Sequence, residues 1–324
     1  MFSVEPVLAL LMLVVAGYIV HKIGLVNQQG LIAMTNLVLY VAIPSIAITN
    51  LQREPTAELV RGLIATFGLS ALFMLITGGI GYLLSFRERE RQRMLITHLC
   101  MFSNCGFMGF PIIAALFGES YMIYAVIINA AFNLLAWTVG VLLLQKDRDK
   151  EAGAGVFSKR EDSLRLEKSR PPIWKILLSP TLIGIAAGIA MFAFRIRLPA
   201  FLYHTFDRLG ELTTPLSMMV VGARIVGQSP KNALNPKVWA LSALRLLVFP
   251  MLTYWACFLF GAPRTVCLIT AVLAGMPHAA LTAMQAEQYK LDIVFASNCV
   301  ALSSLLSMAT IPLLCVLLKI QPPV

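Results

Sequence analysis

The stretch SNCGFMGFPIIAAL, residues 103–116, decides how this chain is interpreted. It places Asn104, Gly106, Gly109 and Pro111 in a run that otherwise has the composition of a membrane-spanning helix. A helix in lipid must satisfy its own backbone groups, yet proline removes one N–H and clashes with the carbonyl one turn back. The stretch therefore predicts a helix that is interrupted near its middle, inside a membrane.

The composition of the whole chain supports the membrane environment. Of 324 residues, 58% are hydrophobic and 13% are charged, and the mean hydropathy is +0.79. A bilayer core of about 30 Å requires roughly 20 apolar residues per helix. The apolar runs are continuous rather than alternating, so they favour helices over barrel strands. We expect an all-α integral membrane protein with ten transmembrane helices, approximately at 4–21, 31–51, 59–86, 94–117, 120–144, 175–194, 204–226, 237–260, 265–286 and 292–318.

Basic residues are distributed unevenly between the two sides of this arrangement. If the N-terminus is outside, the inner loops hold the basic clusters at 87–93, 146–175 and 224–237. Cytoplasmic loops carry the excess of Lys and Arg, which places both termini outside and the central loop in the cytoplasm. We expect a multi-pass protein of the plasma membrane. The net charge of +10 reflects topology, and it is not evidence for nucleic-acid binding.

The most polar segment divides the chain into two halves. Residues 145–174 are rich in charges of both signs and predict a cytoplasmic linker, with regulation or lipid-headgroup binding as the alternative. The first five-helix repeat is then 1–144 and the second is 175–324. Because five spans stand on each side, the halves enter the membrane from opposite faces, as inverted repeats do.

Matching motifs in the two halves support the repeat. GFP at 109–111 lies in the fourth span and GMP at 275–277 in the ninth. A single proline kink is more often a packing feature, but two kinks at corresponding positions favour a function. Two interruptions of this kind can cross near the midplane, where half-helix N-termini direct partial positive charge at one spot. The expected ligand there is an anion.

Two stretches resemble a known family, SNCGFMGFPII at 103–113 and GMPHAALTAMQAEQY at 275–289. Over nearly its whole length the chain is similar to the auxin efflux carrier family, which includes plant PIN-type carriers and bacterial carriers assigned to malonate, malate and related carboxylates. The resemblance implies two inverted repeats with crossover helices 4 and 9. It also implies a scaffold of spans 1, 2, 6 and 7, a transport subdomain of the other six, elevator-like motion and a homodimer.

The resemblance also assigns residues to the substrate site. Asn104 matches the family's carboxylate-contacting asparagine, Pro111 and Pro277 match the two crossover prolines, with Gly109 and Gly275 beside them, and Asn133 matches a polar residue that faces the pocket. The plant carriers have an acidic residue in the third span that is proposed for proton coupling. Residues 62–84 of the third span have no ionisable residue apart from Tyr82, so that scheme does not carry over directly.

Other polar residues within apolar runs have two interpretations each. Asn129 and Asn298 could bind the substrate or hydrogen-bond a neighbouring helix. His278 could titrate and couple transport to protons, or it could be a neutral hydrogen-bonding residue. Arg245 lies deep in the eighth span, with Glu211 or a substrate carboxylate as expected partner, in a structural or a functional role.

The leading hypothesis is a secondary transporter of small organic anions that is coupled to protons. A sodium-coupled symporter of the bile acid type is the alternative. The chain has no GxSxG with a paired histidine and no HExxH, so an intramembrane enzyme is disfavoured, as is a receptor. We expect no cofactor and no metal site, and the six cysteines form no CxxC pair. The expected partners are the organic anion, the coupling ion and membrane lipid.

Overall fold

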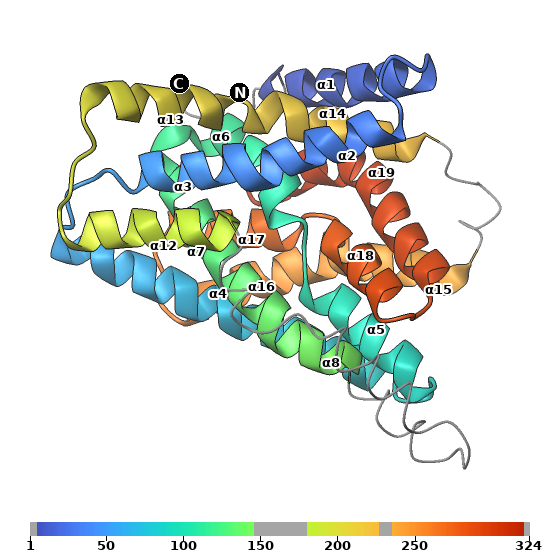
Figure 1. Cartoon of the computed structure of the whole chain (residues 1–324). Coiled ribbons are helices and arrows are strands. Elements are labelled where there is room, and N and C mark those ends of the chain that lie inside the picture. The colour runs from blue at the N-terminus through green and yellow to red at the C-terminus, as the bar shows by residue number, and fades with distance from the viewer. Residues whose placement is uncertain (1–4, 146–179, 227–234, 321–324) are drawn as a thin grey trace, which may run out of the picture.

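The computed structural model describes residues 5–145, 180–226 and 235–320 (Figure 1). Every regular element in these ranges is a helix. The same ranges contain one isolated antiparallel β-bridge. The predicted all-helical class is confirmed. Except for its first residue, the predicted linker at 145–174 lies outside the described residues, as does the beginning of the second half at 175–179.

Each of the ten predicted apolar runs contains at least one helix. In chain order the elements are α1 (Glu5–Lys22), α2 (Gln28–Leu37), η1 (Val38–Ala42), α3 (Ile43–Asn50), α4 (Ala57–Leu84), α5 (Glu90–Met101), η2 (Cys105–Gly109), α6 (Phe110–Phe117), η3 (Glu119–Tyr121), α7 (Met122–Leu135), η4 (Ala136–Gly140), α8 (Val141–Gln145), α12 (Pro180–Ala193), α13 (Ala200–Glu211), α14 (Thr213–Ile225), α15 (Pro236–Ala243), η6 (Leu244–Val248), α16 (Phe249–Leu259), α17 (Arg264–Ala274), α18 (Ala280–Gln288) and α19 (Ile293–Leu317).

Five helical stretches are long and apolar enough to cross a membrane by themselves. They are Gln28–Asn50, Ala57–Leu84, Glu119–Gln145, Pro236–Leu259 and Ile293–Leu317. Shorter apolar helices accompany them at Leu8–Lys22, Cys105–Phe117, Pro180–Ala193 and Arg264–Ala274. The short helices α5, α17 and α18 belong to the predicted fourth and ninth spans, where the chain is interrupted.

Prolines in three apolar runs are accommodated by π turns rather than by breaks. Pro44, Pro111 and Pro250 each stand in the first turn of an α-helix that directly follows a π turn. A proline has no N–H to donate to the carbonyl one turn back, and its ring clashes with that carbonyl. A wider π turn moves the carbonyl away from the ring and relieves the clash. The expectation that Pro111 breaks its helix is therefore wrong. The break lies at 102–104, and the helix continues through Pro111.

Two pairs of helices pack with their backbones in close contact, as Figure 1 shows for α1 beside α14 and α3 beside α12. A Cβ on Gly222 of α14 would overlap the backbone of Val14 in α1. A Cβ on Gly188 of α12 would lie 2.8 Å from the carbonyl oxygen of Ala47 in α3. Small residues permit this approach, which is typical of helix pairs in membranes.

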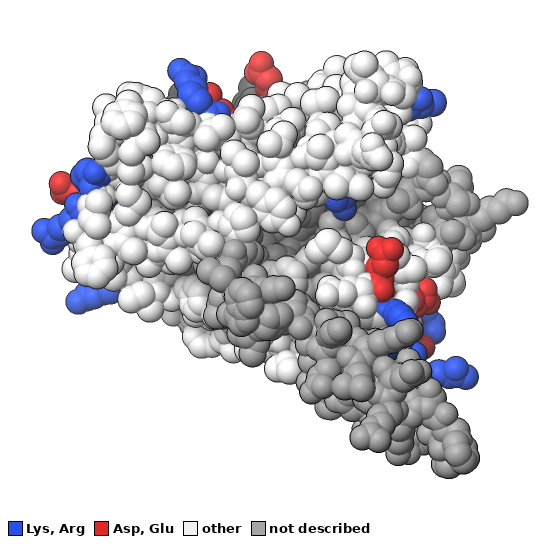
Figure 2. Space-filling view, viewed as in Figure 1, with Lys and Arg blue, Asp and Glu red and all other residues white. Residues whose placement is uncertain are grey.

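The surface and the core have the character of a membrane protein. The charged side chains visible in Figure 2 lie mainly around the edge of that face, with uncharged side chains between them. Helix α4 exposes Ile64 and Leu83, each about two-thirds accessible (67% and 68%), as expected of a helix that faces lipid. The largest buried cluster includes Phe102 and Met276, so both interruptions lie within the core.

Candidate functional site

The two interrupted helices meet each other at their interruptions. Residues 102–104 separate α5 from η2, and residues 275–279 separate α17 from α18. An antiparallel bridge pairs Ser103 with His278. The Asn104 N–H donates to the Pro277 carbonyl at 2.8 Å, and the Ala279 N–H donates to the Phe102 carbonyl at 3.1 Å. Each break thus satisfies part of the other's exposed backbone, as burial in a membrane protein requires.

The local sequence explains why the chain leaves the helix here. Gly275 is the C-cap of α17, and Pro277 follows it without an N–H to continue the helix. Phe102 is extended, with φ −111° and ψ 124°. The Asn104 carbonyl then accepts bonds from the Met108 and Gly109 N–H groups at 3.3 and 3.2 Å, which starts the next helix.

Arg245 joins the C-terminal ends of both interrupted helices. Its side chain comes from η6 and is only 3% exposed. Nη1 donates to the Cys100 carbonyl at 2.7 Å, and Nε donates to the Met276 carbonyl at 3.3 Å. The Cys100 carbonyl belongs to the last turn of α5, and Met276 is two residues beyond the last residue of α17, so the guanidinium contacts both helices near their negative ends, where a cation is favourable. The guanidinium carbon also lies 5.7 Å from the centre of the Phe249 ring.

Glu211, one of the two expected partners of Arg245, lies elsewhere. It is exposed on α13 and pairs with Arg208 at 3.0 Å. The expectation of a Glu211–Arg245 pair is therefore wrong, and Arg245 donates instead to two backbone carbonyls.

At the N-terminal ends that follow the two interruptions, the N-cap residues are Asn104 and Ala279, and neither is acidic. η2 begins at Cys105 and α18 at Ala280, both directly after the crossing. The first N–H groups of any helix have no acceptor within it, and they carry partial positive charge.

Three predicted asparagines lie near the first of these N-terminal ends. Asn129 Oδ1 accepts from the Cys105 thiol at 3.7 Å, and the Asn133 amide donates to the Asn129 carbonyl at 2.8 Å. A Cβ on Gly106 would lie 3.3 Å from Asn129 Oδ1, so a side chain there would crowd the Asn129 amide by a few tenths of an ångström. Asn104 is 8% exposed at the head of η2. Asn104, Asn129 and Asn133 therefore belong to one region.

Three other predicted site residues, His278, Gly109 and Gly275, also pack around the crossing. The His278 ring Nδ1 lies 2.9 Å from the Leu99 carbonyl, and its backbone N–H donates to Ser303 Oγ at 3.1 Å. A Cβ on Gly109 would overlap Leu273 of α17, and one on Gly275 would lie 2.9 Å from Leu314. These two glycines thus allow the helices to approach.

Asn298 is less closely connected to the crossing. It is half-buried on α19, which packs against α5 and α18. In the described part of the chain, none of the hydrogen bonds at the interruptions involves its side chain.

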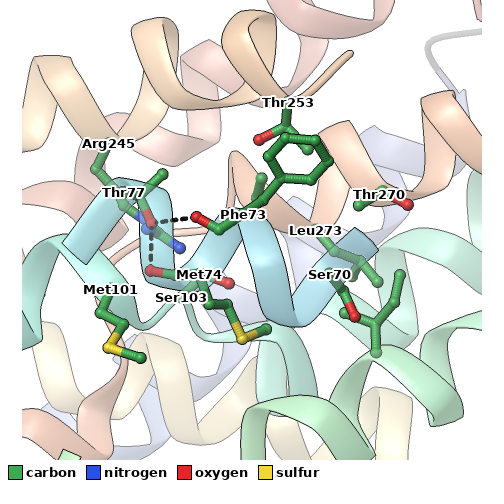
Figure 3. Close-up of a pocket in the computed structure, with 12 residues that line it drawn as sticks. Ser70, Phe73, Met74, Thr77, Met101, Ser103, Arg245, Thr253, Thr270 and Leu273 are labelled. Atoms are coloured by element: carbon green, nitrogen blue, oxygen red, sulfur yellow. Dashed lines mark hydrogen bonds between the residues drawn. The ribbon is translucent and has the colours of Figure 1, made fainter. Parts of the chain in front are cut away.

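A small chamber lies beside the crossing, with room for about 30 Å³, and apolar side chains form the larger part of its lining (Figure 3). Its hydroxyl groups come from α4, α16, α17 and the first interruption, and Arg245 forms part of its wall. The polar lining residues are Ser70, Thr77, Ser103, Thr253, Thr270 and Arg245. Sequence reasoning missed these hydroxyl residues, because single Ser and Thr residues are common in membrane helices and give no distinct signal.

A second buried polar cluster was also missed. His98 lies near the beginning of the predicted fourth span, and it is fully buried on α5, with Nδ1 3.0 Å from Thr282 Oγ1 of α18. Gln285 is equally buried one turn further along α18. The spacing of Thr282 and Gln285, three residues apart on one helix face, is the signal that could have indicated this cluster.

Comparison with known proteins agrees with this architecture. A family model described as "Membrane transport protein" matches residues 2–315. An "Uncharacterized transporter" of Methanothermobacter thermautotrophicus is 26% identical over 98% of this chain and 99% of that protein. A second "Uncharacterized transporter", from Methanocaldococcus jannaschii, is 25% identical over 97% of this chain and 98% of that protein.

A third relative has a name that includes a substrate. The Rhizobium meliloti protein named "Putative malonate transporter" is 22% identical over 92% of this chain and 90% of that protein. Because the family model covers nearly the whole chain, the match is not confined to a single motif. The chain belongs to the membrane transport protein family, the auxin efflux carrier family that its two motifs resemble, and is a transporter rather than an enzyme.

Proposed function

We propose that this chain is a secondary transporter of small organic anions, namely mono- or dicarboxylates such as malonate, malate or auxin-like acids. It works by elevator-type alternating access and is coupled to protons. The substrate carboxylate binds at the crossing, near Asn104 and the N-terminal ends of η2 and α18. Asn133, Gly109, Pro111, Gly275, Pro277 and His278 form or support this site, with Asn129, Arg245 and Asn298 around it.

The observation that carries the proposal is the difference between the C-terminal and the N-terminal helix ends at the crossing. A charged side chain contacts the first pair, whereas the N-cap residues of the second pair are uncharged. Arg245 binds carbonyls at both negative ends. Neither positive end has an acidic side chain as its N-cap, since Asn104 and Ala279 occupy those positions. Helix N-termini that converge in this way bind anionic substrate groups in other transporters.

Helix packing supports ten spans in two inverted repeats. If spans 1 to 5 correspond to spans 6 to 10, the packing of α1 on α14 corresponds to that of α12 on α3. The packing of α4 on α5 corresponds in the same way to that of α16 on α17. Both halves also have an interruption in the matching span. These equivalences favour crossover helices that are related by a two-fold axis in the membrane plane.

The proposed motion follows from a division of the ten spans into a fixed and a moving part. Spans 1, 2, 6 and 7 form a scaffold, and the remaining six carry the crossing from one side of the membrane to the other. Both termini lie outside, and the central linker is cytoplasmic. A homodimer through the scaffold completes the proposed assembly in the plasma membrane.

The position of Arg245 argues against the sodium-coupled alternative. In sodium-coupled transporters, unwound carbonyls and half-helix C-terminal ends hold the ion. Here a guanidinium already contacts carbonyls at both such ends. A sodium ion beside it would meet a like charge in a poorly screened interior. We therefore retain the proton as the coupling ion.

Replacing Asn104 with alanine is expected to weaken substrate binding without unfolding the protein. A hydrogen bond to a charged group contributes about 1.5–3 kcal/mol, which corresponds to a roughly 10- to 100-fold loss of affinity. The measurement is binding of labelled malonate, malate, lactate and indole-3-acetate to purified protein, together with the thermal unfolding midpoint. Asn27→Ala, at an exposed helix N-cap on α2, is the matched control. Wild-type affinity in Asn104→Ala would remove this residue from the site.

The coupling ion is tested separately from the substrate. In proteoliposomes, an inward proton gradient alone should drive accumulation of the acid that binds best, and replacing sodium with choline should leave uptake unchanged. Uptake that requires sodium and ignores the pH gradient would reject proton coupling in favour of the sodium-coupled alternative.

A further inference from the structure

Arg245 carries a full buried charge that its hydrogen bonds offset only with partial charges. Its described partners are two backbone carbonyls near helix C-termini, which satisfy Nη1 and Nε but are dipoles rather than a counter-ion. No carboxylate lies within 4 Å of it among the described residues. Burial of an ionised group is costly unless a counter-ion accompanies it. A source of negative charge is therefore expected beside the guanidinium.

The chamber beside the crossing provides a place for such a charge, because its hydroxyl groups and Arg245 border one space. Arg245 forms part of its wall, and Figure 3 shows the hydroxyl side chains around the same space. Its volume of about 30 Å³ has room for about two water molecules or one small anion, but not for a whole dicarboxylate. Asn104, the proposed substrate ligand, is not among the residues that line it.

The hydrogen bonds of the hydroxyl groups that line the chamber show which donors are still available to a ligand. Ser70, Thr77 and Thr270 donate to carbonyls of their own helices. The Thr253 hydroxyl is different, because the residue is 1% exposed and its oxygen has no hydrogen-bond partner. Nη2 of Arg245 is not used in either of the two carbonyl bonds. A buried, unpartnered hydroxyl and a guanidinium edge therefore border the same space.

We propose that this chamber is an anion-binding site that compensates the charge of Arg245. The ligand is a small monovalent anion such as chloride, or else one carboxylate group of an organic acid. The anion takes the place of an acidic side chain, which the buried face of α4 lacks. The inference does not depend on which substrate is transported, and it would stand if the proposed function failed.

The first test is the thermal unfolding midpoint of purified protein in gluconate buffer, with chloride titrated in at constant ionic strength. Wild-type protein is expected to show a saturable rise. Thr77→Asp supplies a carboxylate in the chamber, so this variant should be stable without chloride and should no longer respond to it. Thr205→Asp, at an exposed position on α13, is the matched control and should respond like wild type.

A second variant and a direct measurement test the site even if the Thr77→Asp variant does not fold. Thr253→Val removes the unpartnered hydroxyl with little change in shape, and the chloride concentration at half-saturation should rise about tenfold or more. Bromide in place of chloride should give an anomalous scattering peak between Arg245 and Thr253 in crystals of the wild-type protein.

Titration with malonate distinguishes the two sources of the anion. Competition between malonate and chloride would assign the chamber to an organic carboxylate, whereas independent effects would assign it to the inorganic ion. A midpoint that is the same in gluconate, chloride, bromide and malonate, together with the absence of bromide from the chamber, would overturn the proposal. The space would then hold water alone.

Discussion

Replacing Arg245 with glutamine is expected to abolish transport and to destabilise the folded protein. The change removes the charge and the Nη1 donor of the Cys100 carbonyl, and the shorter amide of glutamine cannot reach the Cys100 and Met276 carbonyls at once. A buried carbonyl left unsatisfied costs about 1–3 kcal/mol. Unfolding in detergent, followed by intrinsic fluorescence, measures the stability, and uptake into proteoliposomes measures the transport.

Two companion variants make this result specific. Arg208→Gln removes an exposed arginine that pairs with Glu211, and it should change stability by less than about 1 kcal/mol. Arg245→Lys keeps the charge but loses the planar fork that reaches two carbonyls at once, so it should fall between wild type and Arg245→Gln. Wild-type stability and uptake in Arg245→Gln would contradict the role assigned to this residue.

Replacing Gly222 with alanine is expected to disrupt the packing of α14 against α1. The added methyl group would overlap the backbone of Val14 and lie 2.9 Å from the Tyr18 nitrogen. Backbone atoms cannot move aside as the end of a side chain can, so the two helices must separate. Overpacking of this kind costs about 1–3 kcal/mol and occasionally more. The unfolding midpoint in detergent measures the effect.

Gly68→Ala is the matched control, because both glycines lie within helices. A Cβ on Gly68 of α4 would meet nothing within 4 Å. Alanine is favoured over glycine by about 1 kcal/mol inside a helix, so this variant should be neutral or slightly more stable. Equal stability of Gly222→Ala and Gly68→Ala would show that α1 and α14 do not pack as closely as described.

Hydropathy and motif spacing predict the class of this protein and the approximate place of both interruptions. Continuous apolar runs indicate helices, and Gly275 with Pro277 identifies the second break directly, because this pair cannot continue a helix. The first break is harder to locate. Pro111 suggests a break at the wrong position, because a π turn accommodates this proline within a helix and the break lies at 102–104.

Contacts between distant parts of the chain are what the sequence alone does not provide. The depth of Arg245 within its apolar run marks it as unusual, but its partners depend on how η6 packs against α5 and α17. His98 lies near a predicted span end, and its burial depends on the position of α18 beside α5. In both cases the missing information is the relative placement of helices, which hydropathy does not encode.

The central claim is that the crossing carries small carboxylates across the membrane, and counterflow tests it most directly. Proteoliposomes that contain purified protein are loaded with unlabelled malonate, malate, lactate or indole-3-acetate, and uptake of the same labelled acid is followed. We predict transient accumulation of at least one acid, which protein-free liposomes do not show and Asn104→Ala strongly reduces. Absence of flux for all four acids, with protein shown to be folded, would contradict the carboxylate assignment.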